Sequence, residues 1–379
     1  MEIAISNGAA AAQAAEIAVE NQTSVAVMPT ESGAKPVSWQ QFGKDFRGED
    51  VSIADAVQRA GLNFNVLDEE ICRVPKEVAD AIRNGQPMIG WHPTVDSLIS
   101  SHKATYRDDT GQTLGVVGKS YGIVQNDVAF GFVDYLAKVS GRTPKIETAG
   151  SLGVGGRVFV TATLGDDLDL GGGDMVKNYA VISNNHDGKG SVMVFFSPIR
   201  VICQNTLNMA IRTAANKVTF THTSRVNDRI AREQEDIAIA KRVFGDNFKF
   251  SEAFMQEMEQ LKAIKVNAAQ VRDFVAGRFL TPAQFKLWQQ ADYKLDAVEE
   301  ISSQKKNQIA NFATILNTGI GQQQHRGTGL WLVNGVTTLL HNYKSWKDDG
   351  QSEFNSLMSG SGLNTLQDAY RDVLALKAA

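Results

Sequence analysis

The spacing of apolar residues changes along the chain and predicts three regions. Residues 1–36 are rich in alanine and end in a stretch with Pro29, Gly33 and Pro36, which is typical of a linker. We interpret them as a tail and linker, which is either frayed or contacts another copy of the chain. Residues 37–225 alternate short extended runs with turn residues, which indicates an α+β core domain. In residues 226–379 helical spacing dominates, around a loop rich in glycine and glutamine.

The extended runs of the second region come in three pairs, each joined by turn residues. These joints are Asp108-Asp-Thr-Gly111, Gly153-Val-Gly-Gly156 and Asn185-His-Asp-Gly-Lys-Gly190. Strands that follow one another through turns, without helical crossovers, form an antiparallel sheet. Helices are predicted at 50–60, at 75–82 and after Asn126, which we expect to be its N-cap. No glycine cluster lies between a strand and a helix as a dinucleotide-binding fold requires.

The third region continues in helices. The predicted ranges are 205–215, 227–244, 251–264, a helix that begins at Thr281-Pro282, 305–316, 336–343 and 363–376. The expected fold class is therefore α+β, with an antiparallel sheet built from hairpins and backed by helices, followed by a mostly helical C-terminal half.

Composition narrows the class of protein. Of the 379 residues, 43% are hydrophobic and 21% are charged, which is typical of a globular chain rather than a disordered or fibrous one. No apolar run approaches the roughly 20 residues of a membrane span. Two distant cysteines, Cys72 and Cys203, exclude a disulfide framework and a four-cysteine zinc site. Glu2 stands where a secretory signal needs bases, so we expect a cytoplasmic protein.

Several stretches could form a metal, catalytic or phosphate-binding site, but simpler structural interpretations explain them. The carboxylates of Asp166–Asp174 read as an acidic connection between strands, and His186 belongs to a turn. Cys203 follows a strand and has no histidine nearby in sequence to act as a base. The loop 319–329 lacks the Lys-Ser/Thr of a phosphate-binding loop. We therefore predict no catalytic residue, no metal and no cofactor.

Charge is concentrated in one stretch. Residues 177–232 contain eight basic and two acidic residues, although the whole chain has a net charge of −4. Aromatic residues lie between these cations, an arrangement that suits single-stranded nucleic acid. The alternative is a solvated basic face whose phenylalanines point into the core. The candidate phosphate contacts are Lys177, Lys189, Arg200, Arg212, Lys217 and Arg225, and the candidate base-stacking residues are Tyr179 and Phe196.

Several motifs in a fixed order resemble one known family. They include Tyr106-Arg-Asp-Asp-Thr-Gly, Leu114-Gly-Val-Val-Gly-Lys-Ser-Tyr-Gly-Ile-Val-Gln-Asn126 and Gly329-Leu-Trp-Leu-Val-Asn-Gly-Val-Thr337. The most specific is Arg200-Val-Ile-Cys-Gln-Asn-Thr-Leu207. From about residue 38 to the C-terminal helices, the chain resembles the phage/plasmid-like proteins that contain domain of unknown function 932. Leu332 and Gly335 depart from the family pattern.

The resemblance implies a phage, prophage or plasmid setting in a bacterial host cell. The predicted sheet is also similar in outline to single-strand annealing recombinases of the Rad-fifty-two type. Our leading hypothesis is a non-enzymatic, homo-oligomeric single-stranded-DNA-binding protein that acts in replication or recombination, including strand annealing. One alternative is a metal-dependent nuclease that uses Asp108, Asp109 or the carboxylates of Asp166–Asp174. The other is a protein-binding factor that counters host defence.

Overall fold

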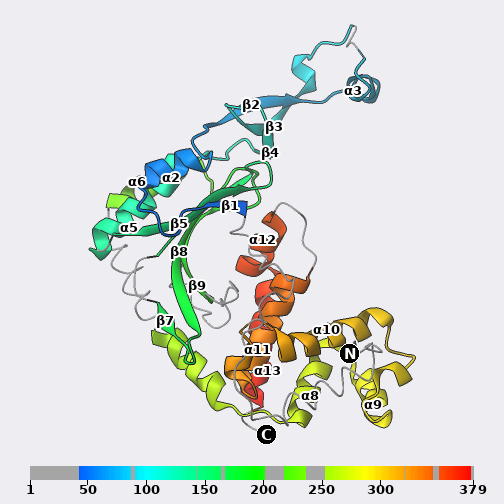
Figure 1. Ribbon diagram of the computed structural model, residues 1–379. Helices are drawn as coiled ribbons and strands as arrows, with labels where there is room; N and C mark the ends of the chain where they lie inside the picture. The colour runs from blue at the N-terminus through cyan, green and yellow to red at the C-terminus, as the bar shows by residue number, and fades with distance from the viewer. Residues whose placement is uncertain are drawn as a thin grey trace, which may run out of the picture.

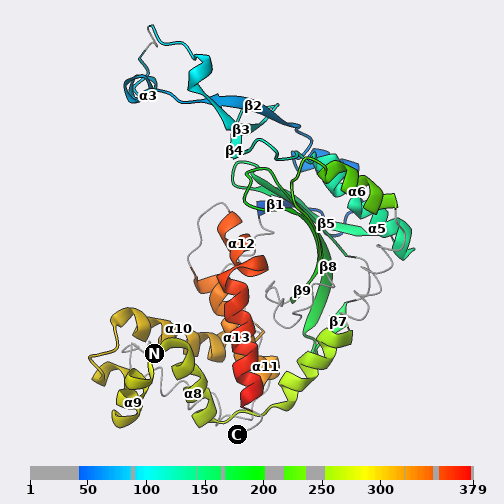
Figure 2. The same ribbon diagram turned by 180° about the vertical axis from the view of Figure 1, so that it is seen from behind.

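The protein contains two antiparallel sheets followed by a helical region, as the sequence predicts for an α+β fold (Figures 1 and 2). The computed structural model describes residues 42–86, 90–141, 143–163, 167–200, 217–235, 252–319, 321–344 and 350–376. Within this part of the chain, no helix is long and apolar enough to cross a bilayer.

The large sheet has the strand order β1-β5-β6-β8-β9-β10, and β7 pairs with β8 outside this path. Its strands are β1 (Gly43–Asp45), β5 (Lys145–Leu152), β6 (Arg157–Thr163), β7 (Leu168–Asp169), β8 (Met175–Asn185), β9 (Val192–Arg200) and β10 (Lys217–Phe220). The predicted hairpins around 153–156 and 185–190 are confirmed as the β5–β6 and β8–β9 pairs.

Strand alternation gives the large sheet two apolar faces with different partners. The outer face, which includes Val160, Ile182 and Phe196, packs against the helices α2 (Ile53–Arg59), α4 (Asn126–Phe130), α5 (Phe132–Ser140) and α6 (Val226–Glu235). The inner face, which includes Phe159, Val181 and Phe195, shares a core with the C-terminal helices. Figure 1 shows the curved sheet with helices on both sides. The two cores follow from the period of two in each strand.

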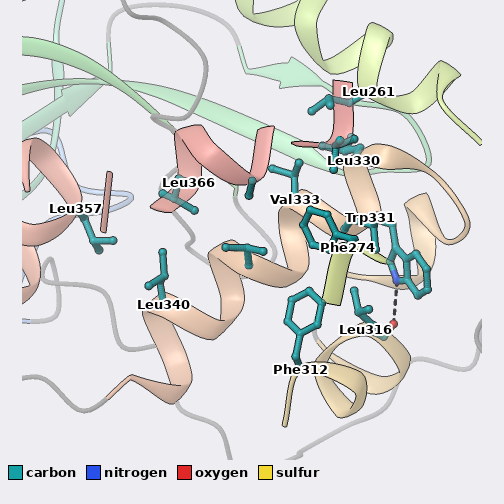
Figure 3. Close-up of a cluster of buried hydrophobic side chains, with 14 of the residues drawn as sticks. Leu261, Phe274, Phe312, Leu316, Leu330, Trp331, Val333, Leu340, Leu357 and Leu366 are labelled. Atoms are coloured by element: carbon teal, nitrogen blue, oxygen red, sulfur yellow. Dashed lines mark hydrogen bonds between the residues drawn. The ribbon is translucent and has the colours of Figure 1, made fainter. Parts of the chain in front are cut away.

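The C-terminal region is a set of packed helices. Their ranges are 252–263, α8 (Ala268–Phe279), α9 (Pro282–Gln290), α10 (Ser303–Thr318), α11 (Gly329–Thr338), α12 (Gln351–Ser359) and α13 (Ser361–Ala375), with a π-helical turn at Leu339–Tyr343. Helix α11 lies at the centre and is buried along its whole length. Its Trp331 Nε1 donates a hydrogen bond to the Leu316 carbonyl at 2.9 Å (Figure 3). A helix that is apolar on all sides belongs in such a central position.

A smaller sheet extends from one end of the large one (Figures 1 and 2). It has the order β2-β3-β4 and consists of β2 (Val66–Cys72), β3 (Leu98–Arg107) and β4 (Thr113–Gly118), with α3 (Lys76–Arg83) near its tip. One of its attachments is through Thr105, whose Oγ1 donates to the His186 carbonyl at 2.7 Å. We refer to residues 66–118 as the arm. The predicted Asp108–Gly111 hairpin is confirmed as the β3–β4 connection.

Helix boundaries show which local signals were reliable. Thr281 caps α9 with Pro282 in its first turn, as predicted, whereas α2 begins three residues after the predicted start at 50, because Ser52 caps it. Asn126 was expected to be a cap, but it is already helical and its side chain bonds elsewhere, so this prediction was wrong. Helix α11 begins at Gly329, seven residues before the predicted start at 336, because Thr328 caps it. The predicted helix 205–215 lies outside the described residues.

Candidate nucleic-acid interface

Lys177 and Tyr179 of β8 lie on the inner face, where both bond to one carboxylate. Lys177 Nζ is 2.7 Å from Glu147 Oε1, and the Tyr179 hydroxyl donates to Glu147 Oε2 at 2.8 Å. Tyr179 is buried in the inner core, and this burial raises the pKa of its hydroxyl above the usual value. In this arrangement Lys177 is neutralised, and the Tyr179 ring has no free face for a base.

Phe196 cannot stack on a base in this structure, so that candidate role needs correction. Its side chain is 1% exposed and belongs to the outer core, where it packs with residues of the helices that cover the sheet. It alternates with Phe195, which points to the inner core instead. The interpretation that the phenylalanines of the basic stretch face the core therefore holds for both residues.

The remaining predicted cations are dispersed. Lys189 is exposed in the β8–β9 turn, 3.7 Å from the Asp187 carboxylate. Lys217 lies on β10 opposite Phe195, which places it on the inner face. Arg200 ends β9, but its side chain is outside what the structure describes, as is the whole of Arg212. The described members of the predicted set therefore do not form a single surface.

Three exposed arginines do lie close together on α6 and the turn before it, with the exposed Asp228 among them in sequence. Val226 and Ile230 are buried in the outer core, so α6 packs on the large sheet although it follows the predicted boundary at 225. Arg225, Arg229 and Arg232 are exposed, and they lie about a quarter of a turn or more away from this buried side. Their spacing of four and three residues places them on one side of a helix. We call these three residues the arginine stripe.

Local bonds hold α6 in place and leave the arginine stripe at the surface. Asn227 Nδ2 donates to the Ile123 carbonyl at 2.9 Å, which ties the start of the helix to the loop after β4. The guanidinium of Arg229 lies 5.8 Å from the centre of the buried Phe220 ring. Arg232 Nε donates to the Asp228 carbonyl one turn earlier. The guanidinium groups of Arg229 and Arg232 are thus held near the Phe220 ring and the helix backbone, while both residues stay exposed.

A second group of polar residues lies buried where the arm meets the large sheet. His186 Nε2 is 2.8 Å from Asn126 Oδ1, and burial lowers the pKa of His186 to about 3. The His222 ring stacks on Tyr121 with 4.6 Å between ring centres, and its pKa is also lowered by burial. The Tyr121 hydroxyl donates to the Asn185 carbonyl at 2.6 Å. Since both histidines are held neutral, this group stabilises the junction and carries no positive charge for a phosphate.

The acidic connection before β8 and the glycine- and glutamine-rich loop before α11 are far apart in sequence but in contact in the structure. Asp174, the last carboxylate of the acidic connection, is fully buried and lies 2.8 Å from Nε2 of His325 in the glycine- and glutamine-rich loop. This contact joins β8 to the segment before α11 across the inner core. Nothing in the sequence spacing could have indicated it, because 151 positions separate the two residues.

Comparison with known families adds one result. A family model described as "Domain of unknown function (DUF932)" matches residues 113–359, more than half of the chain. The chain belongs to this family. No curated protein and no solved structure matches it significantly.

The DUF932 segment begins at Thr113 in β4 and ends at Ser359 in α12. It therefore contains the arginine stripe, all the predicted contact residues and the Asp174–His325 contact, whereas β2 and β3 of the arm precede it. Arg229 and Arg232 contribute to the charge excess of residues 177–232, but the sequence did not single them out. The available signal was the apolar pair Val226 and Ile230, which fixes the buried side of α6.

Proposed function

We propose that the protein binds single-stranded DNA, and that the arginine stripe of α6 supplies its phosphate contacts. The observation that carries this proposal is the exposure of Arg225, Arg229 and Arg232 along one side of a helix whose other side is buried. The stripe spans about 10 Å along the helix, at 1.5 Å per residue. Guanidinium groups match phosphate oxygens in geometry and keep their charge at all relevant pH values.

Binding by this surface should depend strongly on salt and weakly on base sequence. Phosphate contacts release condensed counterions, which makes the affinity fall as salt rises. They carry no direct sequence information. The two residues expected to stack on bases, Tyr179 and Phe196, are buried, so the stripe acts without them.

The test is a titration of a labelled single-stranded oligonucleotide, followed by fluorescence anisotropy at several salt concentrations. Replacing all three stripe arginines by glutamine should reduce the slope of log affinity against log salt by about 2, at roughly 0.7 for each phosphate that the variant no longer neutralises. The control variant replaces two exposed arginines, Arg83 of α3 and Arg371 of α13, by glutamine. It should retain the wild-type slope. Equal slopes in the stripe variant and the wild type would remove the stripe from the interface.

The nuclease alternative gains no support from the part of the chain that is described. The Asp108 carboxylate accepts two hydrogen bonds from Asn65, and Asp109 is paired with Arg107. The described residues contain no group of three His, Cys, Asp or Glu side chains that could hold a metal ion. Adding magnesium to the same titration separates the functions, because a nuclease would shorten the labelled strand.

The wider role is part of the same proposal. We place the protein in a phage or plasmid, in the cytoplasm of a bacterial host, acting in replication or recombination through strand annealing. Self-association is supported by the apolar side chains that the arm exposes, among them Leu67, Val95 and Val116. Sedimentation of the protein with and without the oligonucleotide measures the oligomer size, and pairing of two complementary labelled strands measures annealing.

A further inference from the structure

Helix α3 lies at the end of the arm, away from the large sheet and the C-terminal helices (Figures 1 and 2). It has eight residues, and none of them is buried. Asp80 forms ion pairs with Lys76 and Arg83 along one side of the helix. Val78 and Ile82 are four positions apart and share another side, and Ile82 is 50% exposed. Because isolated helices of this length are marginal in water, α3 needs a partner surface for its apolar side.

Other exposed apolar residues lie where β2 and β3 end, next to α3 in the chain. The Arg73 backbone N–H donates to the Ser97 carbonyl at 2.7 Å, which joins the two segments there. We call residues 73–99 the arm tip; its exposed large apolar side chains are Val74, Ile82, Val95, Leu98 and Ile99. Val95 alone is 84% exposed. Such a concentration of exposed apolar side chains marks an interaction surface.

The charge of the arm tip decides which class of partner fits this surface. Its three basic residues are Arg73, Lys76 and Arg83, and its three acidic residues are Glu77, Asp80 and Asp96. The tip therefore has no net charge. A DNA-binding surface needs an excess of cations, and a helix that lies on a membrane is rich in Lys and Arg on its polar side. Apolar residues among balanced charges are instead typical of a surface that binds protein.

A second copy of the chain offers a matching apolar surface only on its own arm. Among the described residues, nine large apolar side chains are exposed, and seven of them belong to the arm. The two others are Phe42 and Val154. A head-to-tail contact would cover the apolar tip with a polar surface, whereas a contact between two tips covers apolar side chains with apolar side chains. A contact in which both copies use the same surface closes at two subunits.

The free edge of β2 is unsuited to join two copies. This edge strand carries Asp68, Glu69 and Glu70 in succession. Asp68 is paired with Lys103 of β3, but Glu69 and Glu70 are exposed. Pairing of two β2 strands would place carboxylates opposite carboxylates, and charged residues on an edge strand oppose such pairing. The contact is therefore made by side chains of the tip rather than by a sheet that continues from one copy to the next.

We infer that two copies of the chain form a symmetric dimer through their arm tips. The inference rests on the self-association proposed above, to which it assigns a surface and a size, but it does not require DNA binding. The tip exposes 18 of its 24 described residues. A standard interface uses about 20–30 residues on each side, so this contact is a small one, and we expect a dissociation constant of about 1–100 µM. Each dimer carries two arginine stripes.

Sedimentation velocity of the full-length chain without DNA, at concentrations below and above the expected dissociation constant, tests the dimer. The wild type should convert from monomer to dimer and form no larger species. Ile82→Glu combined with Val95→Glu should weaken the dimer by about a hundredfold or more, because a symmetric contact repeats each substitution and buries unpaired carboxylates. The control is Val154→Glu, an equally polar change at an exposed position outside the arm, which should dimerise as the wild type does.

Both substituted residues are exposed, so the tip variant should fold, and its thermal denaturation checks this. If the double variant melts early, Val95→Glu alone serves as the tip variant. A wild type that stays monomeric would overturn the inference, as would species larger than a dimer, an unchanged dimer in the tip variant or a lost dimer in Val154→Glu. The stripe variant should still dimerise, and the tip variant should still bind the labelled oligonucleotide, so failure of one proposal is distinguishable from failure of the other.

Discussion

At the residue scale, burial determines the protonation state of His186. Its ring follows β8, and Nε2 must carry the proton because it faces the carbonyl oxygen of the Asn126 amide. Nδ1 is buried and has no hydrogen-bond partner among the described residues. A second proton would place an unbonded charge in the interior, and this explains the lowered pKa of about 3.

We therefore expect acid to destabilise the protein through His186. Below its ordinary pKa of 6.5, the unfolded chain takes up a proton that the folded chain refuses until about pH 3. The free energy of unfolding should fall with pH by up to about 1.4 kcal/mol per unit, or about 2 kcal/mol between pH 6.5 and roughly pH 5. Urea denaturation at several pH values measures this slope.

A substitution isolates the contribution of this histidine. In His186→Gln the side-chain amide can still donate to Asn126, but it does not titrate, so the pH slope should become shallower. The lowered pKa of His222 accounts for a remaining slope. The control is His102→Gln on the exposed side of β3, which should keep the wild-type slope. A steep slope in His186→Gln would assign the acid sensitivity to other groups.

At the scale of single elements, two helical glycines should respond in opposite ways to alanine. A Cβ on Gly335 of α11 would lie 2.6 Å from Leu316 Cδ2 and 3.1 Å from the Phe312 ring, because α10 and α11 pack closely there. Gly335→Ala should lower the free energy of unfolding by about 1–3 kcal/mol. Gly277 of α8 is exposed and has no atom near that position. Gly277→Ala should raise the free energy of unfolding by about 1 kcal/mol. Urea denaturation of both variants measures the two changes, and an equal change in both would contradict the close packing of α10 on α11 at Gly335.

The elements themselves were largely predictable because their signals are local. The hairpins follow from turn residues such as those at 108–111, and the α9 start follows from Thr281 and Pro282. The start of α11 was missed since a helix that is apolar on all sides has no period to mark its ends.

The candidate site was less predictable, because its decisive contacts join distant positions. Glu147 neutralises Lys177 from 30 residues away. The face of the sheet on which a residue lies separates Tyr179 from Phe196, although both were expected to meet one ligand. The side of α6 that stays exposed depends likewise on which residues the sheet covers. Charge density along the sequence indicated a basic stretch but not the faces over which folding distributes it.

At the scale of the whole molecule, the sheet and the C-terminal helices share one core. The inner-face residues Phe159, Val181 and Phe195 belong to the same cluster as Trp331 and Phe354 of α11 and α12. The contact between Asp174 and His325 crosses the same boundary. The predicted regions 37–225 and 226–379 therefore do not have separate interiors, and neither buries its apolar surface alone.

We expect a fragment of residues 42–235 to fail as an independent unit. It retains both sheets and α6, but the inner face loses its helical cover, and this exposes the apolar residues that the full chain buries. Such a surface favours aggregation. The full-length chain should unfold in a single thermal transition, whereas the fragment should bind the dye ANS and show no cooperative melting. A fragment that melts cooperatively at the full-length Tm would show that the outer core alone stabilises the sheet. In that case the C-terminal helices would be a separable domain, and the inner face would be an interface between two folded units.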